Sequence, residues 1–209
     1  MNFQDYNKIR ASLRYWLLGR NYFKALKAME VGLEYHTGTR KNGAPEFIHQ
    51  VSQVQYARTL ESQLLYPEDT FCTIFLHDIV EDHKYPRSGI KQFGDSVYRA
   101  VELMTDADET GEDKALADYF RAMGYDPIAS FAKGCDRVHN FQTMMGVFKP
   151  EKKERYIREG TDLIIPMLKI ARKQFPEQEQ AYHNVTHILR MQIELIQYSL
   201  TSELQETVS

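Results

Sequence analysis

Cysteines, long apolar runs and surplus basic charge are all scarce in this 209-residue sequence. Its two cysteines, Cys72 and Cys135, lie far apart in apolar-rich segments, which favours buried free thiols in a reducing cytoplasm over a disulfide. No stretch approaches about 18 apolar residues and no apolar segment follows a basic leader, so we expect a cytoplasmic protein without a membrane span. With 26 basic against 29 acidic side chains, long nucleic acid is not an expected partner, although a local basic cluster could bind a small anion.

Strand patterns and several familiar catalytic motifs are also missing. There is no sustained alternation of apolar and polar residues, and Asn42-Gly43 lies in a polar loop rather than in a hairpin. The chain has no P-loop, no Gly-x-Gly-x-x-Gly and no Gly-x-Ser-x-Gly, so ATPase, dinucleotide-binding and serine-hydrolase functions lack support. His183 and His187 have the spacing of a zinc-binding helix, but Asn184 stands where that motif needs Glu. We interpret this pair as an exposed helix face.

Helical periodicity dominates the whole chain, and its length suits one domain covering residues 1–209. We therefore predict an all-α fold. The expected helices cover residues 6–18, 21–35, 47–65, 71–82, 88–93, 95–104, 114–123, 126–147, 150–172 with a kink at Pro166, and 177–197. Residues 106–113 are expected to form an acidic surface loop, and the tail after Ser199 is expected to fray.

The segment Phe75–Asp82 combines an apolar helix pattern with four polar side chains. On a continuous helix, His77, Asp78, Glu81 and Asp82 would share an arc of about 140°. Burying three carboxylates beside an imidazole is costly unless a cation is present, and a divalent metal supplies that cation. The alternative is a surface helix whose acidic side faces water. The His-Asp pair within an apolar sequence favours the metal site.

The segment 128–143 carries a second set of polar residues. Lys133, Asp136, Asn140 and Thr143 fall within about 80° of one another on a helical wheel. Asp136 offers a hard oxygen ligand, the other three offer hydrogen-bond donors, and Arg137 could reach a phosphate or a carboxylate. The alternative is that Asp136 and Arg137 form local salt bridges.

The segment 40–49 is a basic loop followed by a helix start with a histidine. Such a loop can wrap a phosphorylated ligand, and Arg40 could also stack on a nucleobase. A lone histidine at a helix start, here His49, is more often structural, so its interpretation as a ligand depends on the other two segments.

Together the three segments resemble the HD-domain phosphohydrolases, specifically the hydrolase domain of the RelA/SpoT alarmone enzymes and small alarmone hydrolases. The resemblance spans about residues 25–173, and the three motifs occur in the family's order. The pattern Arg-Lys-x-Gly-x-Pro-x-x-x-His is matched by Arg40, Lys41, Gly43, Pro45 and His49. His-Asp-x-x-Glu-Asp is matched by His77, Asp78, Glu81 and Asp82. Lys-x-x-Asp-Arg-x-His-Asn with a trailing Thr is matched by Lys133, Asp136, Arg137, His139, Asn140 and Thr143.

The resemblance implies an HD helical bundle and a role for each matched position. The implied metal ligands are His49, His77, Asp78 and Asp136. The implied pair that orients and deprotonates the attacking water is Glu81 and Asp82. The implied substrate contacts are Arg40, Lys41, Lys133, Arg137, Asn140 and Thr143. Two imidazoles with two carboxylates suit one Mn²⁺, with Fe²⁺, Zn²⁺ and Co²⁺ as alternatives.

The implied activity is removal of the 3′-pyrophosphate from guanosine tetra- or pentaphosphate. The chain is too short to hold the family's separate synthetase domain as well, so we expect degradation and not synthesis. The expected partner is thus a small nucleotide, with neither long nucleic acid nor a membrane, and a homo-oligomer is left open.

Three departures from the family pattern keep other substrates open. Gln50 replaces the usual Pro after the first His, Glu46 replaces a Tyr, and an acidic run follows Thr105. An HD nucleotidase, a deoxynucleotide triphosphohydrolase or an NADPH phosphatase is therefore the second hypothesis. A third hypothesis, a non-catalytic nucleotide- or partner-binding module, predicts a missing metal or water-activating residue, and none is missing.

Overall fold

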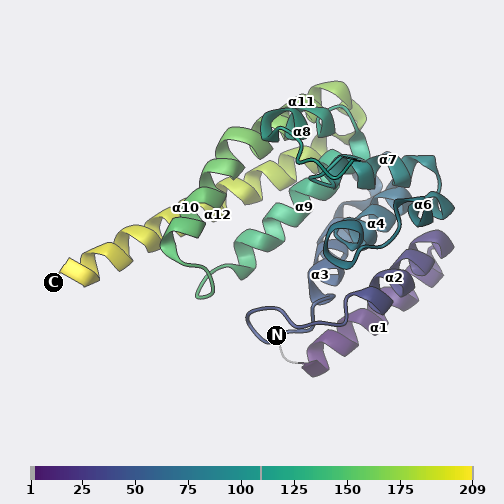
Figure 1. The fold of residues 1–209 in the computed structure, drawn as a ribbon, viewed down its shortest axis with the longest axis horizontal. Helices are drawn as coiled ribbons and strands as arrows, with labels where there is room; N and C mark the ends of the chain where they lie inside the picture. Colours follow the sequence, from purple (N-terminus) through teal and green to yellow (C-terminus); the bar gives the residue numbers. More distant parts are fainter. Residues whose placement is uncertain (1–2, 109, 209) are drawn as a thin grey trace.

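The described part of the chain consists of helices joined by turns and loops (Figure 1). The structure, a computed structural model, describes the backbone of residues 3–108 and 110–208 and the side chains of residues 5–108 and 110–202. Within these residues the extended pairs are two isolated bridges, Thr39 with Pro45 and Ala107 with Asp113. The all-α prediction is confirmed. None of the described helices combines the length and apolar character needed to cross a bilayer.

The helices follow one another in the expected order, with shorter pieces between them. The α-helices are α1 Phe3–Gly19, α2 Phe23–Tyr35, α3 Ile48–Ala57, α4 Pro67–Leu76, α5 Ile79–His83, α6 Arg87–Ile90, α7 Asp95–Met104, α8 Leu116–Met123, α9 Pro127–Thr143, α10 Pro150–Glu159, α11 Ile165–Gln174 and α12 Glu179–Val208. The 3-10 segments are η1 Arg58–Gln63, η2 Lys91–Phe93 and η4 Pro176–Gln178, and η3 Gly160–Ile164 is a π-helical turn.

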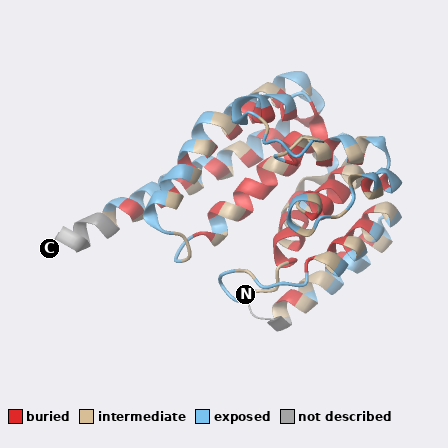
Figure 2. Ribbon diagram, in the orientation of Figure 1, coloured by how far each residue is buried: buried red, intermediate tan, exposed pale blue. Residues whose placement is uncertain are grey.

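Helix α9 lies at the centre of the molecule and carries one of the three motifs. It packs against α3, α4, α7, α11 and α12, and most of its residues are buried (Figure 2). The Asp126 side chain caps its start by accepting hydrogen bonds from the backbone N–H groups of Ile128 and Ala129, at 2.9 and 2.8 Å. Gly134 allows α12 to approach, because a Cβ there would lie 2.7 Å from a methyl group of Val185.

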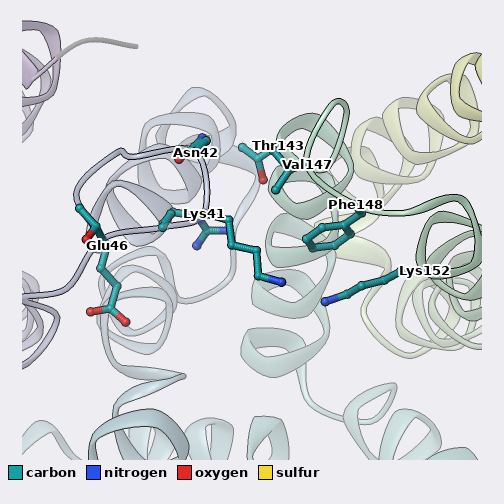
Figure 3. Close-up of a pocket in the computed structure, with 9 residues that line it drawn as sticks. Lys41, Asn42, Glu46, Thr143, Val147, Phe148 and Lys152 are labelled. Carbon is teal, nitrogen blue, oxygen red and sulfur yellow. The ribbon is translucent and has the colours of Figure 1, made fainter.

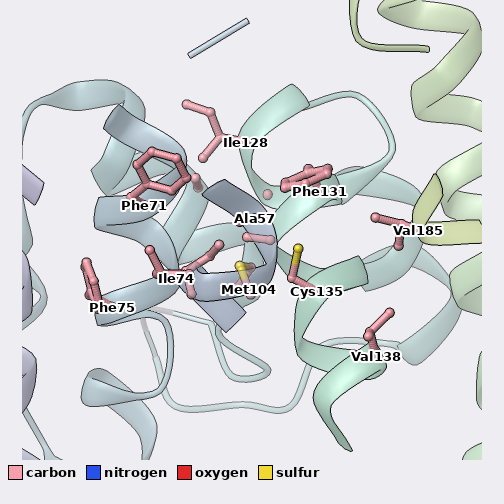
Figure 4. Close-up of a cluster of buried hydrophobic side chains, with 14 of the residues drawn as sticks. Ala57, Phe71, Ile74, Phe75, Met104, Ile128, Phe131, Cys135, Val138 and Val185 are labelled. Atoms are coloured by element: carbon pink, nitrogen blue, oxygen red, sulfur yellow. The ribbon is translucent and has the colours of Figure 1, made fainter. Parts of the chain in front are cut away.

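A continuous apolar core joins α9 to its neighbours (Figure 4). Phe71, Ile74 and Phe75 of α4 lie across from Phe131 and Cys135 of α9, and all five are fully buried. Cys72 and Cys135 are buried free thiols, as expected. Figure 1 shows α1 and α2 side by side on one flank and α10 to α12 on the other, so α4 and α9 lie between two outer layers.

The expected continuous helix 71–82 is wrong. Helix α4 ends at Leu76, and α5 begins at Ile79, so His77 and Asp78 lie in the break between them. Nδ1 of His77 lies 2.9 Å from the carbonyl oxygen of Ile74, an oxygen that a continuing helix would use for the N–H of Asp78. His77 and Asp78 keep right-handed helical dihedrals, but the α-helical hydrogen bonding is interrupted between them, so the arc of about 140° for a continuous helix does not strictly apply.

Other boundaries differ by smaller amounts. The expected helix 47–65 ends as the 3-10 segment η1, and the expected helix 126–147 stops at Thr143. Pro166 lacks the N–H that an α-helix needs, and the π-helical turn η3 comes directly before its turn of helix. The expected fraying after Ser199 is wrong for the backbone, because α12 continues to Val208. The expected acidic loop is present, apart from Glu109, which lies outside the described residues.

Candidate metal centre

Four side chains from three regions of the chain converge beside α9. His49 lies in the first turn of α3, His77 and Asp78 lie between α4 and α5, and Asp136 lies on α9. Nε2 of His49 is 3.1 Å from Oδ1 of Asp136 and 3.7 Å from Oδ2 of Asp78. Nε2 of His77 is 3.0 Å from Oδ1 of Asp78 and 4.0 Å from Oδ1 of Asp136. The fold thus brings together the four residues that the sequence singles out as metal ligands.

The orientation of His77 fits a metal ligand. Its Nδ1–H donates to the Ile74 carbonyl, so Nε2 is the nitrogen that can give up its proton and offer a lone pair to a cation. That nitrogen is buried and has no hydrogen-bond partner among the described residues, although Asp78 is close. A backbone carbonyl that holds the other ring nitrogen is the arrangement usual for metal-binding histidines. One ligand atom each of His49, His77 and Asp78 lies within 4.8 Å of the others, and Asp136 lies 3.1 and 4.0 Å from the two imidazoles, so these side chains could hold one divalent ion.

Two residues without an assigned role hold His49. Nδ1 of His49 lies 2.7 Å from Nδ1 of His139, and burial lowers the pKa of His139 to about 3, so this neighbour is neutral. The amide nitrogen of Gln53 lies 2.8 Å from Nε2 of His49. Gln53 follows His49 by one helical turn, and this i, i+4 spacing is the sequence pattern that could have predicted their contact.

Asp136 is held by two neighbours on its own helix. The Lys133 ammonium lies 3.2 Å from Oδ2 of Asp136, and the Asn140 amide donates to Oδ1 at 2.8 Å. Burial opposes ionisation of Asp136, but Lys133 and His49 outweigh it and hold its pKa well below the usual range. Burial likewise opposes the charge on Lys133, yet Tyr119 and Asp136 raise the pKa of this ammonium above its ordinary value. The centre therefore keeps an ionised oxygen ligand in a buried place.

The His77–Asp78 pair also attracts positive charge. Burial opposes the charged form of His77, but Asp78 and Asp136 raise its pKa to about 9. Burial would raise the pKa of Asp78, but His77 and His49 lower it to about 2. A proton on His77 and a divalent ion thus compete for the same nitrogen.

Glu81 and Asp82 lie on the short helix α5 that follows the break. Glu81 accepts a hydrogen bond from the backbone N–H of Asp106. Although Glu81 is exposed on one side, desolvation of its carboxyl raises its pKa to about 7, and the nearby charges of Asp106 and Asp78 act in the same direction. Desolvation also raises the pKa of Asp82, with a further contribution from Asp78. Both carboxyls therefore ionise less readily than free side chains.

A cavity of about 270 Å³ opens where the loop before α3 faces the turn after α9 (Figure 3). The loop turns at Gly43, which has a positive φ of 79°, and the Arg40 N–H donates to the Ala44 carbonyl at 2.9 Å. Figure 3 shows Lys41 reaching toward Phe148, and the Lys152 ammonium lies 4.0 Å from the centre of that ring. The cavity is lined by Thr39, Arg40, Lys41, Asn42, Glu46, Thr143, Val147, Phe148 and Lys152.

Of the six side chains expected to bind substrate, three line this cavity: Arg40, Lys41 and Thr143. The other three have protein partners instead: Lys133 and Asn140 contact Asp136, and Arg137 forms a buried ion pair with Glu159. Nε and Nη1 of Arg137 have no hydrogen-bond partner among the described side chains and backbone. Phe148 and Lys152 were not singled out, because nothing in their local sequence marks them.

Comparisons with known proteins give relatives that act on guanosine nucleotides. The chain is 30% identical to a probable GTP pyrophosphokinase of Mycobacterium leprae over 148 residues, 68% of this chain and 18% of the relative. It is also 30% identical to a guanosine-3′,5′-bis(diphosphate) 3′-pyrophosphohydrolase of Vibrio cholerae over 146 residues, 66% of this chain and 20% of the relative. This chain is a homologue of the RelA/SpoT-family alarmone enzymes.

The likeness to the RelA/SpoT family covers only one part of its long members. The chain spans about a fifth of the length of the relatives it matches, which also include a GTP pyrophosphokinase of Streptomyces coelicolor. Some of these RelA/SpoT relatives are named pyrophosphokinases and others pyrophosphohydrolases, so homology alone does not select one activity. No protein-family model matches the chain.

Proposed function

We propose that this chain is a metal-dependent pyrophosphohydrolase of HD type that removes the 3′-pyrophosphate from guanosine tetra- or pentaphosphate. The observation that carries the proposal is the convergence of His49, His77, Asp78 and Asp136, with Nε2 of His77 facing the carboxylates. Such a donor set serves a hydrolase, because phosphate-ester hydrolysis needs a cation and an activated water.

The residues of the centre divide the work of hydrolysis between them. A bound divalent ion, for which we propose Mn²⁺ with Fe²⁺, Zn²⁺ or Co²⁺ as alternatives, would polarise the phosphoryl group and acidify water. Glu81, whose pKa is about 7, takes the proton from the attacking water, and Asp82 orients that water. The water oxygen bonds to phosphorus, the bond between phosphorus and the 3′ oxygen breaks, and that oxygen gains a proton as pyrophosphate leaves.

The cavity beside the centre supplies binding for the rest of the nucleotide. Lys41 and Lys152 place two ammonium groups next to the Phe148 ring. A purine can stack on an aromatic ring or on the Arg40 guanidinium, and the lysines can pair with phosphates. Binding groups for both ends of a nucleotide thus line the same cavity.

The direct experiment is incubation of the purified chain with guanosine tetraphosphate and Mn²⁺, followed by ion-exchange separation of nucleotides. We expect GDP and pyrophosphate, and none of either with Asp82→Ala. A parallel reaction with ATP and GTP tests for synthesis. If micromolar protein released no pyrophosphate with any of the four metals, the substrate assignment would be wrong. Formation of the alarmone from ATP and GTP would show that the chain is a synthetase and not a hydrolase.

The position of Glu46 in the cavity favours a second candidate function, hydrolysis of a less charged nucleotide. Glu46 lines the cavity on the side opposite Phe148 and Lys152, where a carboxylate disfavours a second phosphate group (Figure 3). A substrate with fewer charges, such as the nucleotide of an HD nucleotidase, a deoxynucleoside triphosphate or NADPH, would avoid this repulsion. Release of phosphate, pyrophosphate or triphosphate from a nucleotide panel, with the alarmone left intact, would select this candidate.

A further inference from the structure

A second group of ligand-type side chains lies beside the centre described above. His36 follows the end of α2, Glu46 lies in the loop before α3, and His83 is the last residue of α5. Nε2 of His83 lies 2.9 Å from Nδ1 of His36 and 3.4 Å from Oε1 of Glu46, and that oxygen is 3.8 Å from Nδ1 of His36. We call these three residues the His36 cluster. They come from three separate elements and direct one atom each at a common point.

With the Gln50 amide oriented as it is, protons alone leave one contact of this cluster unsatisfied. The Gln50 amide nitrogen faces Asp78 Oδ2 at 3.3 Å and His36 Nε2 at 3.4 Å, so it requires a lone pair on that nitrogen. The proton of neutral His36 is then on Nδ1 and points at His83 Nε2, which leaves the Glu46 oxygen facing a second lone pair. With the proton on Nε2 instead, His36 and Gln50 present two donors to each other.

Turning the Gln50 amide removes this conflict, and the point between the three side chains is then filled either by a proton on His83 Nε2 or by a cation, which competes with that proton. The cation accepts lone pairs from Nδ1 of His36, Nε2 of His83 and Oε1 of Glu46 together. The Gln50 amide then turns, so that its buried oxygen, which has no hydrogen-bond partner in the described part of the chain, accepts the His36 Nε2–H. When the amide turns, Asp78 loses its hydrogen bond from Gln50, and the cation bound at the main centre compensates for that loss. Gln50 therefore couples the His36 cluster to the main centre.

The ligand set and its spacing indicate the kind of cation. Two imidazoles and one carboxylate with an open fourth position suit Zn²⁺ or a similar divalent ion. Tetrahedral bonds of about 2.0 to 2.1 Å place ligand atoms roughly 3.3 Å apart. The three separations in the cluster, 2.9, 3.4 and 3.8 Å, bracket that value. Because Glu46 also lines the substrate cavity, the open position is near bound ligand.

We propose that His36, Glu46 and His83 form a second divalent-cation site, coupled through Gln50 to the centre at Asp78. Glu46 and Gln50 are two positions at which this sequence departs from the family pattern, so the second site is a property of this chain's own residues. The proposal does not depend on the alarmone as substrate, since it concerns cation binding alone.

The test is the metal content of the purified full-length chain after chelator treatment, reloading with Zn²⁺ and gel filtration, measured by mass spectrometry. We expect two equivalents for the wild type and one for Glu46→Gln or His83→Gln. His49→Gln removes the other centre and also leaves one equivalent, and the double variant His49→Gln with His83→Gln leaves none. Circular dichroism melting checks that each variant is folded.

A surface pair provides the matched control. His183 and Glu179 lie 3.3 Å apart on α12, half exposed, without a third ligand in the metal-capable groups of the described residues. His183→Gln should therefore keep two equivalents. One equivalent in the wild type, or two in folded Glu46→Gln and His83→Gln, would overturn the second site. Loss of alarmone hydrolysis with two equivalents bound would instead count against the proposed function alone.

Discussion

Nδ1 of His77 lies 2.9 Å from the carbonyl oxygen of Ile74, and this one contact determines which ring nitrogen faces Asp78. The contact occurs where α4 stops, so the end of the helix and the orientation of the imidazole have the same cause. The buried Nε2 is left facing two carboxylates. The first prediction follows from this arrangement.

Replacing His77 with Gln should remove cation binding at the main centre, because the amide cannot present a nitrogen lone pair. We expect the variant to bind one equivalent of divalent metal fewer than the wild type and to release pyrophosphate about 10- to 100-fold more slowly or worse, since support of a metal site is worth at least that much. Metal content and pyrophosphate release measure the two effects. His187→Gln, on the exposed side of α12, is the control and should match the wild type. A fully active His77→Gln protein would contradict the assignment.

The pH profile should report the Glu81 carboxyl. Desolvation raises the pKa of Glu81 to about 7, and a general base works only when ionised. Hydrolysis should therefore fall as pH drops through about 7 and reach a plateau above it. Glu81→Gln should lower kcat by about 100- to 10,000-fold and abolish this acidic limb. An unchanged limb in the residual activity of Glu81→Gln would assign the titration to another group.

Lys152 should contribute to substrate binding and little to the chemical step. Its ammonium lies in the cavity wall over Phe148, outside the three motifs. A charge-assisted hydrogen bond contributes about 1.5 to 3 kcal/mol, so Lys152→Ala should raise KM by roughly 10-fold or more with kcat nearly constant. Steady-state kinetics separates the two constants. Lys169→Ala, at an exposed position of α11, serves as the control, and a drop in kcat alone would place Lys152 in a different role.

Gly134 should be essential for the contact between α9 and α12. A methyl group at this position would lie 2.7 Å from Val185, in a core that has no space to give. We expect Gly134→Ala to lower the free energy of unfolding by about 1 to 3 kcal/mol. Gly19→Ala at the end of α1, where nothing lies within 4 Å of the added Cβ, should be close to neutral. Urea denaturation of both variants makes the comparison, and equal midpoints would show that α12 can shift.

Local patterns predicted much of the site and could not supply its partners. The spacing of Lys133, Asp136 and Asn140 places them on one face of α9. Only the structure shows that Lys133 and Asn140 both contact the Asp136 carboxylate. Arg137 was expected to contact substrate, and its ion pair with Glu159 depends on how α10 packs against the rest. Because Arg137 and Glu159 lie on different helices, the helical repeat of the sequence does not predict that they are close.

The sequence alone predicted the all-α class, most of the helices and the order of the four ligand-type residues, because backbone periodicity and side-chain chemistry depend on near neighbours. Only the tertiary structure decided that α4 ends at Leu76, that His49 reaches Asp136, and that His36 meets His83. These contacts join segments distant along the chain. They form because burying the apolar faces of α3, α4 and α9 in one core brings their polar residues close to one another.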